Sequence, residues 1–170
     1  MNAFAVFQPG RTDTVAHDQF MRRAAALALE KMRQNIGGPF GAVIVRGDEI
    51  IAEGWNEVTS SGDPTAHAEI VAIRRACARF ATFQLPDCDI FSNCEPCPMC
   101  LGAIYWTRLR HIYFVHTRAE AAAIGFDDDF IYREIALAPA ARTIPATRLV
   151  RPHGLDPFGE WVSKPDKVPY

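Results

Sequence analysis

Apolar residues recur along the chain with two spacings, one typical of helices and one typical of strands. From His17 to Gln34 they recur at helical spacing, and Gly37-Gly38 ends this pattern, which predicts a helix. Two β-rich runs follow, Phe40 to Val45 and Glu49 to Trp55, and they flank Gly47-Asp48. A glycine-containing dipeptide between two such runs is typical of a hairpin, so we expect two mostly buried strands here.

After the hairpin, helical and strand-like patterns alternate. Ala66 to Phe80 has helical spacing and is followed by a strand in "CDIFSN", a helix in "CPMCLGAIYWT", a strand in "HIYFVH" and a helix in "AEAAAI". Strands that alternate with helices need crossover connections, which predicts an α/β fold, a three-layer α/β/α sandwich whose later strands run parallel. From Pro139 onward the periodicity is weak, and we expect a short helix or strand and a tail.

Length, hydrophobic content and charge indicate how many domains the chain forms and what kind of partner it binds. With 170 residues and 49% hydrophobic content, we expect a single domain over residues 1–170. Eighteen basic residues against twenty acidic ones argue against a nucleic-acid surface and favour a small neutral partner. No apolar run reaches membrane-spanning length, and the N-terminal run is too short for a secretory signal. Five cysteines in such a chain are expected to be reduced thiols in the cytoplasm.

The stretch "CEPCPMC" holds three of these cysteines. Cys97 and Cys100 fall in the first turn of a predicted helix, where both sulfurs reach one ion and the helix N-terminus favours thiolates. His67 begins the preceding predicted helix after a polar loop. Two such helix starts side by side supply three ligands and leave a fourth tetrahedral position for water. The pattern therefore predicts a catalytic zinc site.

Glu69 lies two residues after His67 and is the candidate proton carrier. Two thiolates cancel the charge of Zn²⁺, so the ion is a weak Lewis acid and its water needs a nearby base. A carboxylate at this place takes the proton and returns it to a ring nitrogen and then to a leaving amine. "HAE" and "PCPMC" match the H-x-E and P-C-x-x-C signature of zinc deaminases.

Cys94 is the candidate fourth ligand of a closed structural zinc site, which is the main alternative. It falls at the end of a predicted strand and Pro96 separates it from Cys97, so we expect its sulfur in the core. Cys77 and Cys88 are expected to be small buried hydrophobic residues.

An acidic run, Asp127 to Asp129, precedes "FIY". We expect Asp129 to cap a following helix. No structural role is then assigned to Asp128, which makes it a candidate to bind a substrate amine.

Four segments, "GGPFGAVIV", "NEVTSSGDPTAHAE", "CEPCPMCLGAIYW" and "GFDDDFIYREI", resemble the cytidine deaminase-like superfamily and, within it, the bacterial guanine deaminases. The likeness runs from the first helix to near residue 145 and includes a terminal tyrosine. The resemblance implies a mixed five-stranded sheet between helices, a bound zinc ion, and a homodimer that exchanges a C-terminal segment, residues 153–170 here. The implied reaction is attack of activated water on C2 of guanine, which yields xanthine and ammonia.

The resemblance also assigns roles to single residues. It implies zinc ligation by His67, Cys97 and Cys100, and proton transfer by Glu69. Asn56 is implied as a substrate contact that donates and accepts hydrogen bonds, and Asp128 as a second carboxylate of the pocket. The expected substrate contacts further include Phe40, Ala66, Trp106 and Tyr170, with a core role for Trp106 equally open.

Three alternatives are weighed: two other deaminases and, from another class, a binding module. A tRNA adenosine deaminase shares "HAE" and "PCxxC" but should carry a basic surface, which the acidic balance and "GFDDDF" argue against. Cytidine deaminase is disfavoured because its free-nucleoside form resembles a pattern with cysteine in place of His67. A zinc-stabilised binding module would use a closed site, and Glu69 would then be only a charge on the helix surface.

Overall fold

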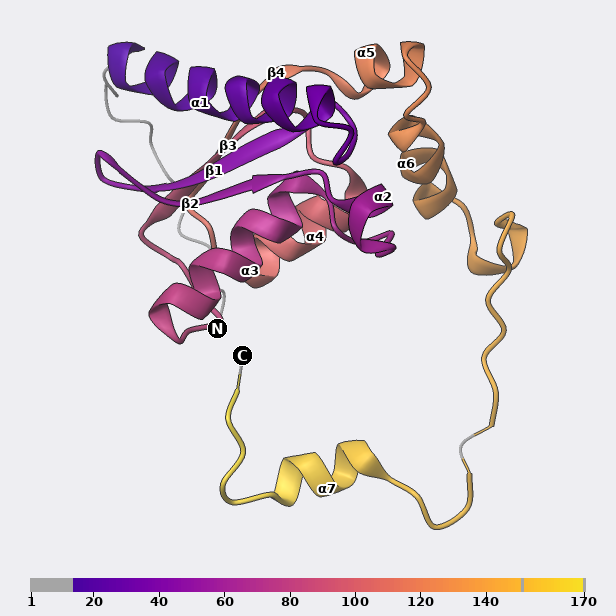
Figure 1. The fold of residues 1–170 in the computed structure, drawn as a ribbon. Coiled ribbons are helices and arrows are strands. Elements are labelled where there is room, and N and C mark those ends of the chain that lie inside the picture. Colours follow the sequence, from indigo (N-terminus) through magenta and orange to yellow (C-terminus); the bar gives the residue numbers. More distant parts are fainter. Residues whose placement is uncertain (1–13, 151, 170) are drawn as a thin grey trace.

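A four-stranded mixed sheet forms the centre of the computed structural model, which describes residues 14–150 and 152–169 (Figure 1). The strands are β1 (Gly41–Arg46), β2 (Glu49–Trp55), β3 (Cys88–Cys94) and β4 (His111–His116), in the order β2-β1-β3-β4. β1 pairs antiparallel with β2 and β3, and β3 pairs parallel with β4. The hairpin and the parallel later pair are therefore confirmed.

The expected five-stranded sheet is wrong for this chain. Within the described ranges no fifth strand joins the sheet, and the outer edge of β4 has no strand beside it. The residue pattern predicts four strands, and the fifth was implied only by resemblance. The chain after β4 forms helices and then leaves the sheet, so it supplies no further strand.

One face of the sheet is covered by α1 (Thr14–Arg33). Phe20 and Leu27 of this helix pack against Val43, Val45 and Phe91. The helix lies very close to the sheet at Gly41, where a Cβ atom would come within 2.2 Å of the carbonyl oxygen of Ala24. Only glycine fits at this contact.

The opposite face is covered by α3 (Ala68–Phe80) and α4 (Pro98–Trp106) (Figure 1). The core between them contains Ala42, Ile44, Ile90, Ala72, Ala76 and Ile104. Side chains of β1 point alternately to the two faces, so both faces of this central strand are buried. The layers are helix, sheet and helix, as the alternation of elements predicts.

Three short helices surround the ends of the strands: α2 (Val58–Ser61), α5 (Arg118–Ala123) and α6 (Asp128–Ala136). α6 is capped by Asp127, whose side chain accepts a hydrogen bond from the Phe130 amide at 3.0 Å. The expectation that Asp129 is the cap is therefore wrong. Asp129 lies inside the first turn and forms ion pairs with Arg118 and Arg133 instead.

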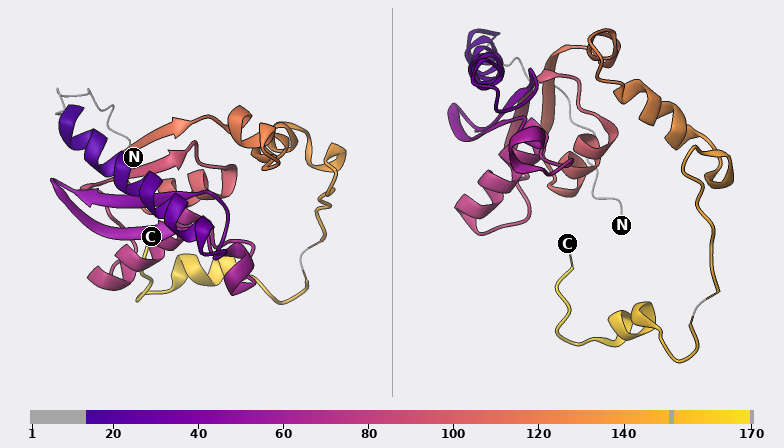
Figure 2. Two further views of the ribbon diagram at one scale, coloured as in Figure 1. Left: turned by 45° about the horizontal axis from the view of Figure 1, so that its top comes forward. Right: turned by 45° about the vertical axis from the view of Figure 1, so that its right-hand side comes forward.

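The C-terminal part runs away from the sheet in an open arc that includes η1 (Pro139–Ala141) and α7 (Pro157–Ser163) (Figures 1 and 2). Its apolar side chains are mostly exposed; Val150 and Phe158, for example, are 93% and 85% exposed. This part of the chain therefore has little contact with its own core. Within the described residues, no helix combines the length and the apolar character needed to cross a membrane.

Candidate active site

Two metal-ligand candidates occupy equivalent positions at the starts of neighbouring helices. His67 is the N-cap residue of α3 and Cys97 is the N-cap residue of α4, both with extended backbone angles. Neither side chain makes a capping hydrogen bond in the described structure, so both remain available to a ligand. Pro98 at the first position of α4 suits the helix start, and Cys100 follows within the first turn.

His67, Cys97 and Cys100 come together at one point. The Nδ1 atom of His67 lies 3.6 Å from the sulfur of Cys97 and 3.6 Å from that of Cys100. Tetrahedral zinc, with bonds of about 2.05 Å to nitrogen and about 2.3 Å to sulfur, separates two such ligand atoms by about 3.6 Å. The three side chains therefore fit a zinc ion, with Nδ1 as the histidine ligand atom.

Cys94 lies outside this group of candidate ligands in the described part of the chain. It is buried, and desolvation raises the pKa of its thiol to about 12. Its sulfur is within 4.0 Å of the Thr117 carbonyl oxygen. A closed four-ligand site with Cys94 is therefore not supported, and three protein ligands leave one tetrahedral position open.

The pKa values of the three ligand candidates are shifted in different directions. A hydrogen bond from Cys100 lowers the pKa of Cys97 to about 4. A hydrogen bond with His67 lowers it as well, and burial has the opposite effect. The Cys97 thiolate in turn raises the pKa of Cys100, as does burial. The hydrogen bond with Cys97 also raises the pKa of His67. A metal ion that displaces these protons would thus be bound more tightly as pH rises.

Glu69 lies in the first turn of α3, and only 6% of it is exposed. Its Oε1 accepts a hydrogen bond from the Ser92 hydroxyl at 3.2 Å, and its Oε2 lies 3.5 Å from the Cys100 sulfur. Burial raises the pKa of the Glu69 carboxyl. A carboxyl with a raised pKa beside the cluster is suited to take up and return a proton. Sequence reasoning did not identify Ser92, which has no motif of its own.

A cavity of about 320 Å³ opens at the cluster. Its wall includes His67, Cys97, the two carboxylates Glu69 and Asp128, and the amide of Asn56. The structure therefore brings together residues from both helix starts, from the loop after β2 and from α6.

Asn56 is oriented by its own backbone neighbours. Its Oδ1 accepts hydrogen bonds from the amides of Gly38 at 3.2 Å and Val58 at 3.3 Å, so both lone pairs are used. Only the amino group is left for a ligand. The expectation that Asn56 both donates and accepts toward a substrate is therefore wrong, because the folded chain makes it a donor.

Two aromatic rings form another part of the wall. Phe40 and Phe126 meet edge to face, with ring centroids 4.7 Å apart. A Cβ atom at Gly38 would lie 3.2 Å from the Phe126 ring, so this glycine leaves room for the ring. Phe40 was expected at the site and Phe126 was not. The position of Phe126 directly before the acidic run is the signal that could have identified it.

Asp128 is the first residue of α6 and lines the cavity. Burial, followed by the negative charge of Cys97, raises the pKa of its carboxyl.

Of the other expected contacts, Ala66 is buried beside the site but is not on the cavity wall. Its carbonyl oxygen accepts from the Glu57 amide at 2.9 Å, which holds the loop before His67.

Trp106 lies at the end of α4, away from this cavity. It lines a separate hollow with Phe83 and Val168. It is 60% exposed, so a core role for Trp106 is wrong. Tyr170 lies outside the described residues, and its expected contact stays a prediction.

The chain matches the family described as "Cytidine and deoxycytidylate deaminase zinc-binding region" over residues 14–116. It is 50% identical over 154 residues to guanine deaminase of Bacillus subtilis, an alignment that covers 91% of this chain and 99% of that protein. The X-ray structure of the Bacillus subtilis enzyme superposes with a TM-score of 0.87 and covers 91% of this chain and 98% of that one.

Two further similarities are lower in identity and coverage. The tRNA-specific adenosine deaminase of Haemophilus influenzae is 36% identical over 118 residues, which cover 66% of this chain and 68% of that protein. A protein solved in complex with 2,6-diaminopurine is 32% identical, with a TM-score of 0.63, and covers 66% of this chain and 62% of that one.

Proposed function

Because the chain belongs to the cytidine and deoxycytidylate deaminase family, we propose that it is a zinc-dependent hydrolase that converts guanine to xanthine and ammonia. The observation that carries this proposal is the convergence of one zinc-binding triad and two carboxylates on a single cavity. The extent of the similarity to a guanine deaminase, nearly end to end, supports guanine as the substrate.

His67, Cys97 and Cys100 would hold the metal, and a zinc ion bound there would supply a Lewis acid that makes a water molecule acidic. Glu69 takes the proton of this water. Ser92 occupies Oε1, and Oε2 accepts from the Cys100 thiol at 3.5 Å. Cys100 loses this proton when it binds a metal as a thiolate, and Oε2 is then the oxygen available for the transfer. The carboxyl gives this proton to a ring nitrogen of the substrate. It then takes a second proton from the new hydroxyl group on C2 and gives it to the amine, which leaves as ammonia while the carbonyl of xanthine forms.

Asn56 and Asp128 recognise different sides of the substrate in this proposal. The Asn56 amino group donates to an acceptor, and guanine offers two adjacent acceptors, O6 and N7, along one edge. The Asp128 carboxylate accepts from the exocyclic amine that leaves. Phe40 and Phe126 supply the apolar wall that a planar base needs.

Ammonia release from a panel of guanine, adenine, cytosine, cytidine, adenosine and ammeline tests the assignment. The expected result is turnover of guanine well above that of the other compounds. Deamination of adenosine in a tRNA anticodon stem-loop, without turnover of guanine, would instead support the second candidate, which the similarity to the Haemophilus influenzae enzyme keeps open.

We further infer that the chain is one domain that works as a homodimer and that residues 153–170 are exchanged between subunits. Two observations support this. The tail exposes Phe158 and Val162, and the outer strand β4 exposes Phe114 and Val115, so both have apolar surface for a second copy to cover. Tyr170 would then reach the partner's cavity. A cytoplasmic location stays a prediction.

A further inference from the structure

The helix that carries Asp128 is weakly packed. α6 has nine residues, all of them described, and none is buried. Its apolar Phe130 and Ile135 are 41% and 54% exposed. Apolar burial therefore does little to fix the position of this helix. Because Asp128 nevertheless lies on the cavity wall, polar contacts must set where its carboxylate points.

Tyr132 ties α6 to the loop that carries a metal-ligand candidate. Its Oη donates a hydrogen bond of 2.9 Å to the carbonyl oxygen of Pro96, which directly precedes Cys97. Tyr132 follows Asp128 by four residues on the same helix, and side chains at this spacing share one face. The face that presents the Asp128 carboxylate to the cavity is thus held against the metal-ligand loop.

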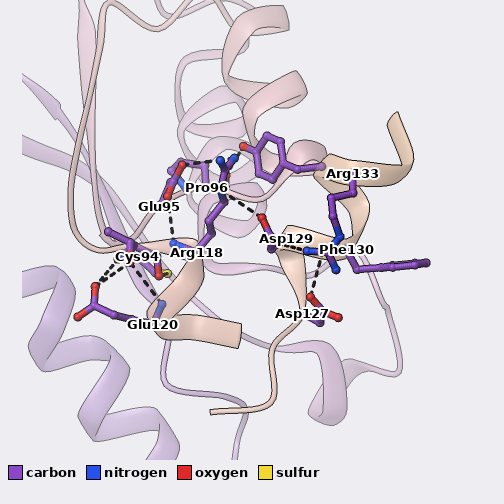
Figure 3. Close-up of polar contacts among 11 residues, drawn as sticks. Cys94, Glu95, Pro96, Arg118, Glu120, Asp127, Asp129, Phe130 and Arg133 are labelled. Atoms are coloured by element: carbon purple, nitrogen blue, oxygen red, sulfur yellow. Dashed lines mark hydrogen bonds and ion pairs between the residues drawn. The ribbon is translucent and has the colours of Figure 1, made fainter. Parts of the chain in front are cut away.

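Arg118 of α5 makes a second tie. Its backbone amide donates to Oε2 of Glu95 at 3.0 Å, and its guanidinium lies 4.5 Å over the Tyr132 ring. Its Nε is 3.6 Å from Oδ1 of Asp129. Figure 3 shows Arg118 with Glu95 on one side and Asp129 on the other. One arginine therefore joins the loop after β3 to both α5 and α6.

We propose that Tyr132 and Arg118 are positioning residues that dock α6 on the loop before Cys97 and so hold the Asp128 carboxylate at the leaving amine of the substrate. This inference rests on the proposed function, in which Asp128 binds that amine. Neither Tyr132 nor Arg118 is among the described residues that line the cavity, so both act through Asp128. The contact of Phe126 with Phe40 and the Asp127 cap fix the backbone where the helix begins, next to Asp128. Tyr132 and Arg118 fix how the helix lies after that point, and so which way its Asp128 face is turned.

Tyr132→Phe tests the first tie because it removes one hydrogen bond and keeps the ring under Arg118. We expect kcat for guanine to fall about tenfold while KM changes less than about twofold, since a small displacement of a group that binds the reacting amine is costly. Zinc content and the midpoint of thermal unfolding should stay near the parent values, because no core residue is changed. Arg118→Met should act in the same direction.

Arg133→Gln is the matched control. Arg133 pairs with Asp129 from the solvent side of the same helix and is 61% exposed. Removing this pair leaves both ties to the body in place, so kcat should not change. A fall in kcat with Arg133→Gln equal to that with Tyr132→Phe would overturn the proposal, because any loosening of the helix would then suffice.

A double-mutant cycle separates positioning from general loosening. In an Asp128→Ala background no carboxylate is left to position, so adding Tyr132→Phe should lower kcat further by less than about twofold. A full tenfold loss in both backgrounds would overturn the proposal. So would unchanged kcat in the Tyr132→Phe single variant.

Hydrogen exchange gives a readout that does not depend on turnover. The amides of residues 128–136 should exchange faster in Tyr132→Phe than in the parent, and no faster in Arg133→Gln. If the parent releases no ammonia from guanine, the proposed function fails, and exchange still decides the docking of α6. Equal exchange in the parent and in Tyr132→Phe would overturn that docking.

Discussion

Asn56→Asp tests the direction of the hydrogen bond between the protein and its substrate. One oxygen of the new carboxyl can still accept from the amides of Gly38 and Val58, which Oδ1 of Asn56 accepts now at 3.2 and 3.3 Å. The other oxygen replaces the amino group that faces the cavity. The variant therefore keeps the local fold and removes only the donor, whereas Asn56→Ala would also leave two backbone amides without their acceptor.

The size of the effect follows from the burial of the site. Asn56 is 7% exposed, so the lost donor is not replaced by bulk water. Two acceptors then face each other, one on the substrate and one on the protein, and leaving each buried polar group unpaired costs about 1.5 kcal/mol. The total of about 3 kcal/mol corresponds to a fall of roughly a hundredfold in kcat/KM.

The pH dependence of kcat/KM in Asn56→Asp is a second test of whether the protein must donate at this position. A protonated carboxyl can donate where an ionised one cannot, and the neighbouring acidic groups Glu69 and Asp128 favour protonation of the new one. The deficit of Asn56→Asp relative to the parent should therefore shrink as pH falls. Comparison of guanine with 2-aminopurine, which lacks O6, and 7-deazaguanine, which lacks N7, identifies the acceptor. Near-parent kcat/KM at neutral pH in Asn56→Asp would refute the donor assignment.

Three further predictions concern the metal site and the tail. Glu69→Gln should bind about one zinc ion per chain yet lose 10²–10⁴-fold in kcat, because an amide cannot carry the proton; near-parent turnover would show that another group carries it. Cys94→Ser should keep zinc and most activity by metal analysis and ammonia release, and loss of metal would indicate a closed site. Deletion of residues 153–170 should leave a folded, zinc-containing protein with sharply reduced guanine turnover by ammonia release, and a monomer by light scattering would support exchange of the tail; full activity would exclude a covering role.

The metal cluster could be predicted from sequence because its spacing has a local cause. A ligand at a helix N-cap and another in the first turn point the same way in any helix. The spacing of Cys97 and Cys100 along the chain therefore determines how their sulfurs lie relative to each other. His67 needed one further inference, that a second helix begins at the same edge of the sheet. Both inferences depend on elements with clear periodicity.

The errors arise where several neighbours offer the same chemistry or where the contact is distant in sequence. Any of three consecutive aspartates can cap a helix, and only the point at which the backbone turns helical selected Asp127 over Asp129. The orientation of the Asn56 amide depends on the Gly38 amide eighteen residues away. The bond from Tyr132 to Pro96 spans thirty-six residues and has no motif. Such contacts follow from packing, which spacing along the chain does not encode.

The site draws on two regions of the chain. The triad and Glu69 lie within residues 14–116, the region that matches the deaminase family, and β4 ends this region at His116. Phe126 and Asp128 lie beyond it, before and at the start of α6, and both line the cavity. Proton transfer at a metal site is common to deaminases, but the choice of base requires contacts that differ among them. The proposed docking of α6 on the metal-ligand loop would therefore add substrate contacts from outside the matched region to a reaction centre that deaminases share.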